Sequence, residues 1–254
     1  MECPKCGGDR GADEVSCDQC GLVFHKYERY LERKKALEAR RTKRERSCAQ
    51  RLGRVVHWLG TPNADMVSLW WGYAALWLVL LVWGWGYITS DIDTLARQPG
   101  FLHNVNLPFH EAGHLIFSPF GAWVGSLGGT LGQLLMPTVC GIALLYQRQD
   151  MFGGSVCLWW FGQNFLDIAP YMADARAGQL PLLGGNFGHS SPYGFHDWEF
   201  ILGELGLLAY DTTFAAWTLN AGRLVMLTAY AWGGWLLWQA WHESVRPSQD
   251  CRGR

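Results

Sequence analysis

The chain has 254 residues, of which 49% are apolar and fifteen are Trp. This excess of apolar and aromatic residues is typical of membrane spans and interfacial belts, and it disfavours an ordinary soluble protein. The formal net charge of −1 is an average over two unlike parts, because a polar, basic first fifth precedes an apolar remainder. We therefore expect a membrane domain joined to a small polar segment.

Residues 1–25 contain two Cys-x-x-Cys-Gly knuckles, one built on Cys3 and Cys6 and the other on Cys17 and Cys20. This spacing can place four thiolates around one tetrahedral zinc ion, so we predict a zinc ribbon. Four Cys ligands leave no open coordination position, which makes this ion structural. So small a module has almost no core, and metal binding would supply most of its folding energy. A pair of disulfides is the alternative, which a reducing cytoplasm disfavours.

Residues 26–60 form a basic linker. Between Lys26 and Arg54 lie twelve of the 21 Lys and Arg residues, with only four Glu. The pattern from Tyr27 to Arg54 predicts a charged helix with a thin apolar stripe. Such a helix suits an anionic membrane surface or serves as a solvated spacer. We expect no nucleic acid as a partner, because the linker has neither an aromatic stacking platform nor a recognition helix.

Residues 61–245 are expected to form a membrane-embedded domain, followed by a polar tail at 246–254. The segment from Met66 to Ser90 has no charged side chain and exceeds the roughly 20 residues that cross a bilayer. It starts too late to be a cleavable signal peptide, and the Lys and Arg before it favour a cytoplasmic N-terminus. The uncharged stretch Leu115–Gln147 is long enough for the end of the motif helix and a further glycine-rich span or hairpin, and spans are expected at Ser155–Tyr171, Phe200–Leu219 and Leu224–Trp241. The predicted fold class is an all-α polytopic membrane protein with about five to six transmembrane helices and an N-terminal zinc ribbon.

A His-Glu-x-x-His motif runs from His110 to His114. On a helix the two histidines stand one turn apart on one face, where they can bind one zinc ion. Glu111 is then placed as the general base that takes a proton from a zinc-activated water. Asn106 as N-cap and Pro108 in the first turn predict that the helix begins just before the motif. Two interfacial histidines with a stray carboxylate are the alternative, which is costly in an uncharged apolar run.

A catalytic zinc site needs a third protein ligand, with the fourth position left to water. Many soluble zinc peptidases supply a His six residues beyond the second His, but that position is Phe120. Others supply a downstream Glu, and the first Glu after the motif is Glu199. The soluble templates therefore fit poorly.

These residues resemble the site-2-protease family of intramembrane zinc metallopeptidases. That family pairs a membrane-embedded His-Glu-x-x-His with a distant segment in which Asn and Pro precede an Asp that opens a later helix and is the third ligand. Here Asn164 and Pro170 precede Asp197, and Trp198 stands where the family has Gly. The resemblance covers Asn104–Leu202 and implies Asp197 as the third ligand of a catalytic zinc.

Several other residues compete for this role. Asp167 and Asp174 lie seven residues apart on one predicted helical face, which makes both of them alternatives to Asp197. His196 is a further candidate. Asp197 itself could instead be the N-cap of the helix that follows. His103 is interpreted as an interfacial or loop histidine.

The resemblance also implies substrate-binding residues. The family has a glycine-containing segment after the motif helix, and a polar residue of that segment helps to hold the substrate backbone. Gly129–Gln133 is similar, with Gln133 as the polar member, and Asn164 is the second expected substrate contact. Close helix packing through the glycines is the alternative for Gly129–Gln133.

The expected activity is that of an intramembrane zinc metallopeptidase that hydrolyses membrane-protein substrates, with one catalytic and one structural zinc. The expected location is the lipid bilayer of a bacterial inner (plasma) membrane, with the ribbon available to a cytoplasmic protein partner. The rival is a non-catalytic zinc-binding membrane adaptor that presents the ribbon. Glu111 disfavours it, because a structural zinc needs no such carboxylate. A metal transporter would need polar groups through several spans, and only the stripe Asn164–Asp174 suggests them.

Overall fold

The computed structural model describes residues 2–9, 15–182, 187 and 196–246, with the backbone alone for residues 42–49. The chain consists of two compact units, Met1–Leu59 and Gly60–Arg254. Residues 247–254 of the predicted polar tail lie outside the described residues.

The first unit consists of two short loops and one long helix. Isolated antiparallel bridges close the loops that carry the cysteine knuckles, and α1 (Phe24–Gly60) follows them directly. The predicted charged helix from Tyr27 to Arg54 is thus confirmed. Within the described residues of this unit, the buried apolar core consists of Cys3, Cys17 and Phe24. So small a core buries too little apolar surface to hold the loops by itself.

Helices joined by short loops make up the described part of the second unit. Its elements are α2 (Ala64–Ser68), α3 (Trp70–Thr89), α4 (Ile92–Arg97), α5 (Gly100–Phe117), η1 (Ser118–Phe120), α6 (Ala122–Ala143), the π-helical turn η2 (Leu144–Arg148), α7 (Met151–Ala173), α8 (Asp197–Glu204), η4 (Leu208–Tyr210) and α9 (Asp211–Val245). No strand occurs among the described residues, where the only β-pairing is in isolated bridges. The all-α prediction is confirmed in this respect.

Among the described residues, two helices are long and apolar enough to cross a membrane, namely α3 and the continuous helix Ala122–Arg148. Leu78, Val79 and Val82 on α3 are exposed, and apolar side chains that face outward together suit lipid better than water. These two helices support association of the chain with a membrane.

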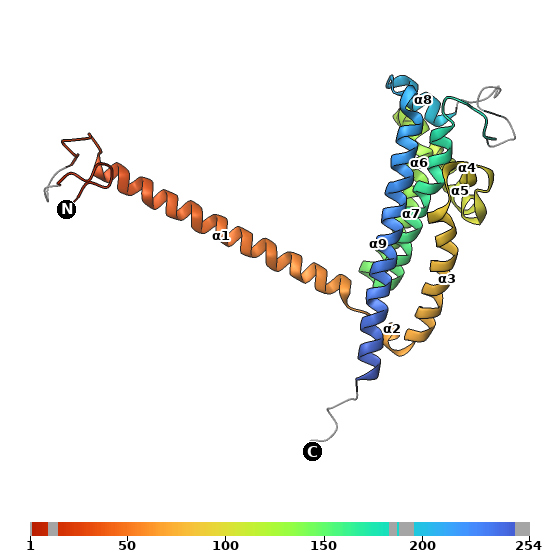
Figure 1. The fold of residues 1–254 in the computed structure, drawn as a ribbon, viewed down its shortest axis with the longest axis horizontal. Helices are drawn as coiled ribbons and strands as arrows, with labels where there is room; N and C mark the ends of the chain where they lie inside the picture. The colour runs from red at the N-terminus through yellow and green to blue at the C-terminus, as the bar shows by residue number, and fades with distance from the viewer. Residues whose placement is uncertain (1, 10–14, 183–186, 188–195, 247–254) are drawn as a thin grey trace, which may run out of the picture. The chain divides into compact units, whose positions relative to one another are not determined.

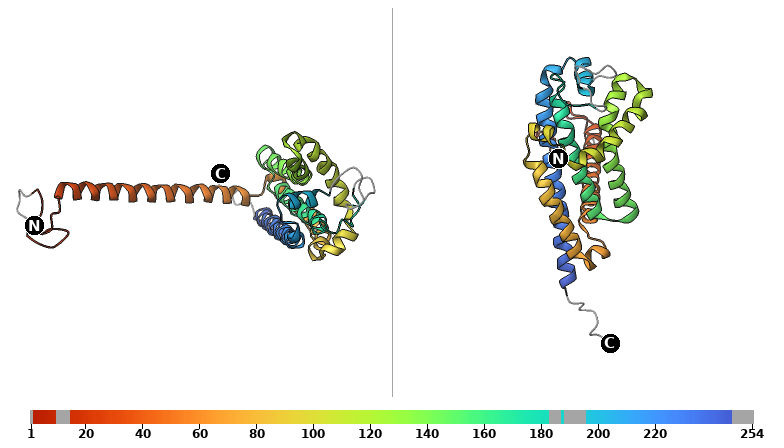
Figure 2. Two further views of the ribbon diagram at one scale, coloured as in Figure 1. Left: turned by 90° about the horizontal axis from the view of Figure 1, so that it is seen from above. Right: turned by 90° about the vertical axis from the view of Figure 1, so that its right-hand side faces the viewer.

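Three long helices of the second unit, α3, α7 and α9, pack along one another (Figure 1). Figure 2 (left) looks nearly along the helices of this unit and shows them gathered into a bundle. Tyr230 on α9 joins the three: its hydroxyl accepts the indole N–H of Trp159 on α7 at 2.7 Å and donates to the Leu80 carbonyl on α3 at 2.7 Å. Polar groups paired in this way are inexpensive to place in an apolar bundle.

Glycines allow two pairs of helices to approach closely. Between α7 and α9, a Cβ at Gly222 would lie 2.7 Å from the Gly162 carbonyl oxygen, and between α5 and α6 a Cβ at Gly128 would lie 2.7 Å from that of Gly113. Neither position has room for a side chain, and such small-residue interfaces are common between membrane helices. The close approach of α6 brings the glycine-rich segment against the His-Glu helix.

The helix that carries the His-Glu motif begins earlier than the sequence predicts. α5 starts at Gly100, so Asn106 is not its N-cap and Pro108 lies inside it. Proline removes one backbone hydrogen bond from a helix, yet α5 continues through it. Asn106 is 1% exposed, and its amide bonds to side chains of α7. The capping prediction was wrong because those partners come from a distant segment.

The predicted span Phe200–Leu219 is also wrong, because the chain breaks within it. α8 ends at Glu204, Gly206 adopts a φ of 67°, and α9 begins only at Asp211. A left-handed glycine is a common helix terminator. The Asp211 side chain is fully buried and pairs with the Arg176 guanidinium at 2.7 Å, which fixes the new helix start. The predicted span Leu224–Trp241 lies within α9.

Candidate metal centres

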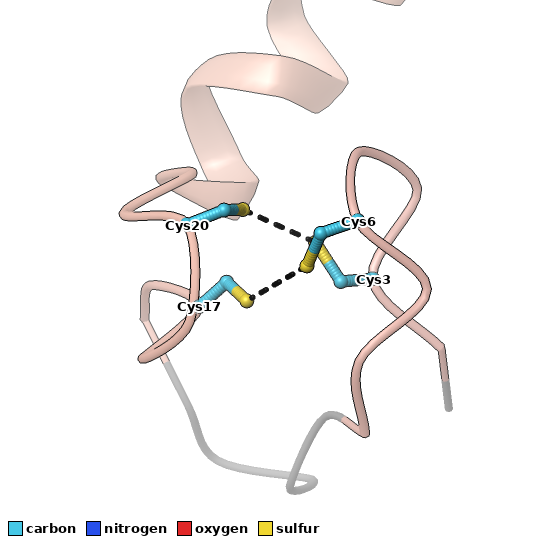
Figure 3. A group of neighbouring side chains, drawn as sticks. All are labelled: Cys3, Cys6, Cys17 and Cys20. Carbon is cyan, nitrogen blue, oxygen red and sulfur yellow. Dashed lines mark hydrogen bonds between the residues drawn. The ribbon is translucent and has the colours of Figure 1, made fainter.

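Four cysteine side chains point toward one another in the first unit (Figure 3). The Sγ atoms of Cys3 and Cys20 are 3.7 Å apart, and those of Cys6 and Cys17 are 3.6 Å apart. Four sulfurs at about 2.3 Å from a tetrahedral zinc ion lie about 3.8 Å from one another, so this cluster fits a zinc-sized ion. All four cysteines are free in the structure, and the convergence of all four sulfurs on one point favours the metal cluster over two separate disulfides.

Hydrogen bonds shift the pKa values of Cys3 and Cys6 in opposite directions. The backbone N–H of Lys5 is the main cause that lowers the pKa of Cys3 to about 6. The backbone N–H of Gly8 lowers the pKa of Cys6, but the hydrogen bond with Cys20 and further contacts outweigh it and raise that pKa to about 12. The knuckle backbone therefore favours a thiolate at Cys3, and the thiolate is the form that binds a metal ion.

A second group of ligand-type side chains lies in the second unit and consists of His110, His114 and Asp197. The Nε2 atoms of His110 and His114 lie 3.3 and 3.1 Å from Oδ2 of Asp197. The two imidazoles are nearly perpendicular, with ring centroids 4.7 Å apart. These side chains are 23%, 28% and 26% exposed in the same order, so a water molecule or a small ligand can reach them.

The separations in this group suit a zinc ion. Nitrogen and oxygen ligands at about 2.0–2.1 Å from a tetrahedral zinc lie about 3.3 Å apart, which agrees with the observed 3.1 and 3.3 Å. Two imidazoles and one carboxylate are also a donor set that zinc accepts, with the fourth position open. The first-ranked prediction for the third ligand, Asp197, is the one that the fold brings to the two histidines.

α6 contacts the other nitrogen of each imidazole. Nδ1 of His110 lies 2.9 Å from Oε1 of Gln133, and Nδ1 of His114 lies 2.8 Å from the carbonyl oxygen of Gly125. Hydrogen bonds of this kind fix the tautomer and the orientation of a metal-binding histidine. Gln133 therefore touches a candidate ligand, and its role in substrate binding stays a prediction.

Glu111 lies between the two histidines on α5 and is half-buried. Among the described residues, none donates a hydrogen bond to its carboxylate. A carboxylate beside a metal site that is free of such bonds can accept a proton from a water molecule there.

Asp197 is the first residue of α8, and the residue before it caps this helix. Nδ1 of His196 accepts the backbone N–H of Glu199 at 3.4 Å. The alternative in which Asp197 is the N-cap is therefore wrong, and its carboxylate is left to the histidines. His196 itself is outside the ligand group and is 2% exposed.

The Asp174 carboxylate accepts hydrogen bonds from the loop after α7, and Asp174 does not belong to the group formed by His110, His114 and Asp197. Its Oδ1 accepts the N–H of Gln179 at 2.9 Å and its Oδ2 accepts that of Leu180 at 2.8 Å. Nε2 of His196 lies 3.7 Å from the same Oδ2. These contacts make Asp174 a loop-closing residue.

Asp167 belongs to a separate polar cluster between α5 and α7. Its Oδ1 lies 3.0 Å from Nδ1 of His103, and its Oδ2 accepts the Asn106 amide at 3.1 Å. The Asn106 amide also donates to Gln163 at 3.1 Å and accepts the indole N–H of Trp160 at 2.9 Å. We call these five residues the Asn106 cluster. Sequence reasoning missed it, although Asn106 precedes His110 by one helical turn on the same face, which is a usable signal.

Asn164 lies in α7 and is fully buried. Its amide donates to the Trp160 carbonyl at 3.0 Å, and its Oδ1 has no hydrogen-bond partner within the described part of the chain. A buried acceptor without a partner is rare and costly. The interpretation of Asn164 as a substrate contact stays a prediction.

A comparison of the chain with protein-family models, with curated proteins and with solved structures finds no match. The two clusters of ligand-type side chains therefore carry the functional argument.

Proposed function

We propose that the chain is an intramembrane zinc metallopeptidase of the site-2-protease type. One observation carries this proposal: His110, His114 and Asp197 converge from two separate helices at separations that suit one zinc ion. Glu111 stands next to them, and a site that only holds a structural ion has no need of this carboxylate. The four-cysteine cluster would hold a second, structural zinc ion.

The membrane domain supports this assignment through its helices. α3 and the continuous helix formed by α6 and η2 have the length and apolarity of membrane spans, and α5, α7 and α9 lie between or beside them in the same bundle. We propose that these five helices cross the membrane, at the lower end of the expected five to six spans. The basic residues of α1 precede the first span, which favours a cytoplasmic N-terminus. A bacterial inner membrane is the proposed location.

The chemistry follows from the side chains present. Zinc, when bound, supplies a Lewis acid that polarises a peptide carbonyl and makes water more acidic. The Glu111 carboxylate accepts a proton from the attacking water and transfers it to the nitrogen of the leaving amine. Contacts from α6 keep the imidazoles of His110 and His114 in the orientation that leaves Nε2 available. The partial exposure of the ligands leaves room for the carbonyl.

The proposed substrates are membrane proteins with a locally unwound segment. Peptide bonds within a helix in lipid are shielded by their own hydrogen bonds, so small or helix-breaking residues near the scissile bond would favour cleavage. The zinc ribbon would bind a cytoplasmic protein partner and so recruit or restrain substrates. Deletion of residues 2–25 tests this role: unchanged substrate range and regulation would contradict it.

The first test is the zinc content of the purified full-length chain in detergent. We expect two zinc ions per chain, of which His110→Ala removes one and Cys3→Ser with Cys6→Ser removes the other. A chain that binds only the cysteine-held ion would overturn the metallopeptidase proposal.

The second test is proteolysis that depends on Glu111. Cells that express the wild-type chain and cells that express Glu111→Gln are compared for new protein N-termini in the membrane fraction. We expect termini within membrane segments that are lost in Glu111→Gln, while this variant keeps both zinc ions. Full zinc content without any Glu111-dependent terminus would favour the non-catalytic adaptor instead.

A further inference from the structure

Three residues of α6 face the proposed zinc site at regular intervals. Gly125, Gly129 and Gln133 are four residues apart, and therefore lie about one helical turn apart on one face. All three are buried. We propose that this set, the α6 row, positions His110 and His114 for the metal ion. The inference rests on the metal site of the proposed function and gives Gln133 a role different from substrate binding.

Gln133 fixes the ring of His110. Its Oε1 is 2.9 Å from Nδ1 of His110, and an amide oxygen can only accept a hydrogen bond. The proton of the neutral imidazole therefore sits on Nδ1, and the lone pair of Nε2 points to the side where Asp197 lies at 3.3 Å. Gln133 is 4% exposed, so its amide oxygen has little access to other partners.

Gly125 fixes the ring of His114 through its backbone. The carbonyl oxygen of Gly125 lies 2.8 Å from Nδ1 of His114, and a carbonyl has two lone pairs with which it can serve a second donor. The proton again sits on Nδ1, which leaves Nε2 to face Asp197 at 3.1 Å. Both imidazoles thus receive the same tautomer from the same face of α6.

Gly129 leaves the space in which the two rings meet. A Cβ at this position would lie 2.5 Å from Nε2 of His110 and 2.5 Å from Nε2 of His114. Real Cβ atoms do not approach nitrogen so closely, so any side chain here would displace the two ligand atoms themselves. Alanine is a better helix former than glycine, so Gly129→Ala should damage the metal site and spare α6.

The test measures zinc binding to the full-length chain in detergent, by zinc content and by competition with a chromophoric chelator. We expect Gln133→Met to weaken the second-unit site by roughly 10- to 100-fold, the usual effect of losing a hydrogen bond behind a metal ligand. Gln133→Glu keeps an acceptor oxygen and should retain near wild-type affinity. Gly129→Ala should lower the zinc content from two ions to one.

Gly141→Ala is the matched control for Gly129→Ala. It makes the same exchange in the same helix, where the new Cβ would meet only Cys157 Cβ at 3.2 Å, and it should keep both ions. In every variant, retention of the zinc ion in the cysteine cluster serves as an internal control for the integrity of the first unit. Elution as a single species in size-exclusion chromatography reports that the membrane domain is folded.

The possible results separate the two proposals. Wild-type chain with two ions, together with unchanged zinc affinity in Gln133→Met and Gly129→Ala, would overturn the role of the α6 row and leave the metallopeptidase proposal intact. Wild-type chain with only the cysteine-held ion would overturn the metal site, and the α6 row with it. An increase in KM of Gln133→Met for a cleaved peptide, at unchanged zinc affinity, would assign Gln133 to substrate binding and also overturn the inference.

Discussion

The two candidate metal centres differ in how their ligand-type side chains are brought together. The four cysteines lie within one short stretch, in two loops whose own turns direct the sulfurs inward. The histidines and Asp197 come from α5 and α8, and α6 contacts both imidazoles. Under the proposed function, the metal ion would organise the fold of the first unit, whereas the fold of the second unit would organise its metal site.

The buried cores explain this difference. The first unit buries Cys3, Cys17 and Phe24, of which two belong to the four-cysteine cluster. The main core cluster of the second unit contains aromatic and aliphatic side chains from α3, α4, α5, α7 and α9, including Trp159 and Tyr230. A unit with so small a core would depend on a bound ion for its stability, whereas a packed bundle would not.

The largest expected effect is loss of the ribbon fold when its zinc ion is removed. Cys3→Ser with Cys6→Ser deletes two of four ligands, and structural zinc in finger peptides contributes an apparent binding free energy of about 10–16 kcal/mol. We expect backbone amides of residues 2–25 to exchange hydrogen freely in this variant, while those of α7 and α9 stay protected. Hydrogen exchange read by mass spectrometry measures both regions together. Protection of residues 2–25 equal to wild type would show that this unit folds without a metal ion.

The next effect concerns the third ligand in the second unit. Asp197→Ala removes a carboxylate that lies 3.1 and 3.3 Å from the two Nε2 atoms. Loss of this ligand should lower the zinc affinity by more than the roughly 10- to 100-fold that follows from loss of a hydrogen bond behind a ligand. We expect one zinc ion per chain instead of two, with helix content unchanged by circular dichroism. Asp174→Asn and Asp167→Asn are the matched controls, and both should keep two ions. Loss of zinc in either control and not in Asp197→Ala would reassign the ligand.

The local chemistry of both centres could be predicted from the sequence. Cys-x-x-Cys-Gly turns and the i, i+4 spacing of His110 and His114 operate within a few residues, and the structure keeps both arrangements. The uncharged segment from Met66 to Ser90 likewise became a membrane-length helix, α3, preceded by a short turn of helix. Periodicity and spacing suffice where the interacting groups are neighbours in the chain.

Contacts between distant segments could not be predicted in the same way. Asn is common at helix N-caps and Pro in first turns, so Asn106 and Pro108 predicted a helix start at this point. In the structure α5 begins earlier, and Asn106 instead forms hydrogen bonds with side chains of α7. The break inside Phe200–Leu219 depends on the ion pair between the buried Asp211 carboxylate and the exposed Arg176 guanidinium, which no hydropathy window reveals. For the same reason the spacing alone left Asp167, Asp174 and Asp197 as rivals.

A smaller effect is expected from the Asn106 cluster, which holds α5 against α7 next to the metal site. Asn106→Leu leaves the Trp160 indole N–H, the Gln163 amide oxygen and the Asp167 carboxylate each without one partner. Unpaired buried groups cost about 1–3 kcal/mol each, so we expect a loss of roughly 3 kcal/mol in unfolding free energy. Denaturant titration in detergent micelles measures it.

Asn104→Leu is the matched control for Asn106→Leu. Asn104 is two residues away on the same helix but exposed, so the same exchange should change stability by less than about 0.5 kcal/mol. Equal effects of the two substitutions would indicate that the Asn106 cluster does not stabilise the bundle.

The smallest expected effect concerns the N-cap of α8, and it tests whether this cap contributes to zinc affinity in the second unit. His196 caps α8 through its Nδ1, and loss of a cap costs about 1 kcal/mol. Because α8 begins at Asp197, a less stable first turn would hold the Asp197 carboxylate less firmly. We therefore expect His196→Ala to weaken zinc binding in the second unit about fivefold. His196→Asn retains a capping oxygen and should bind zinc as wild type does, because His196 is not a ligand. A complete loss of this zinc ion in both variants would instead make His196 a ligand and displace Asp197 from the site.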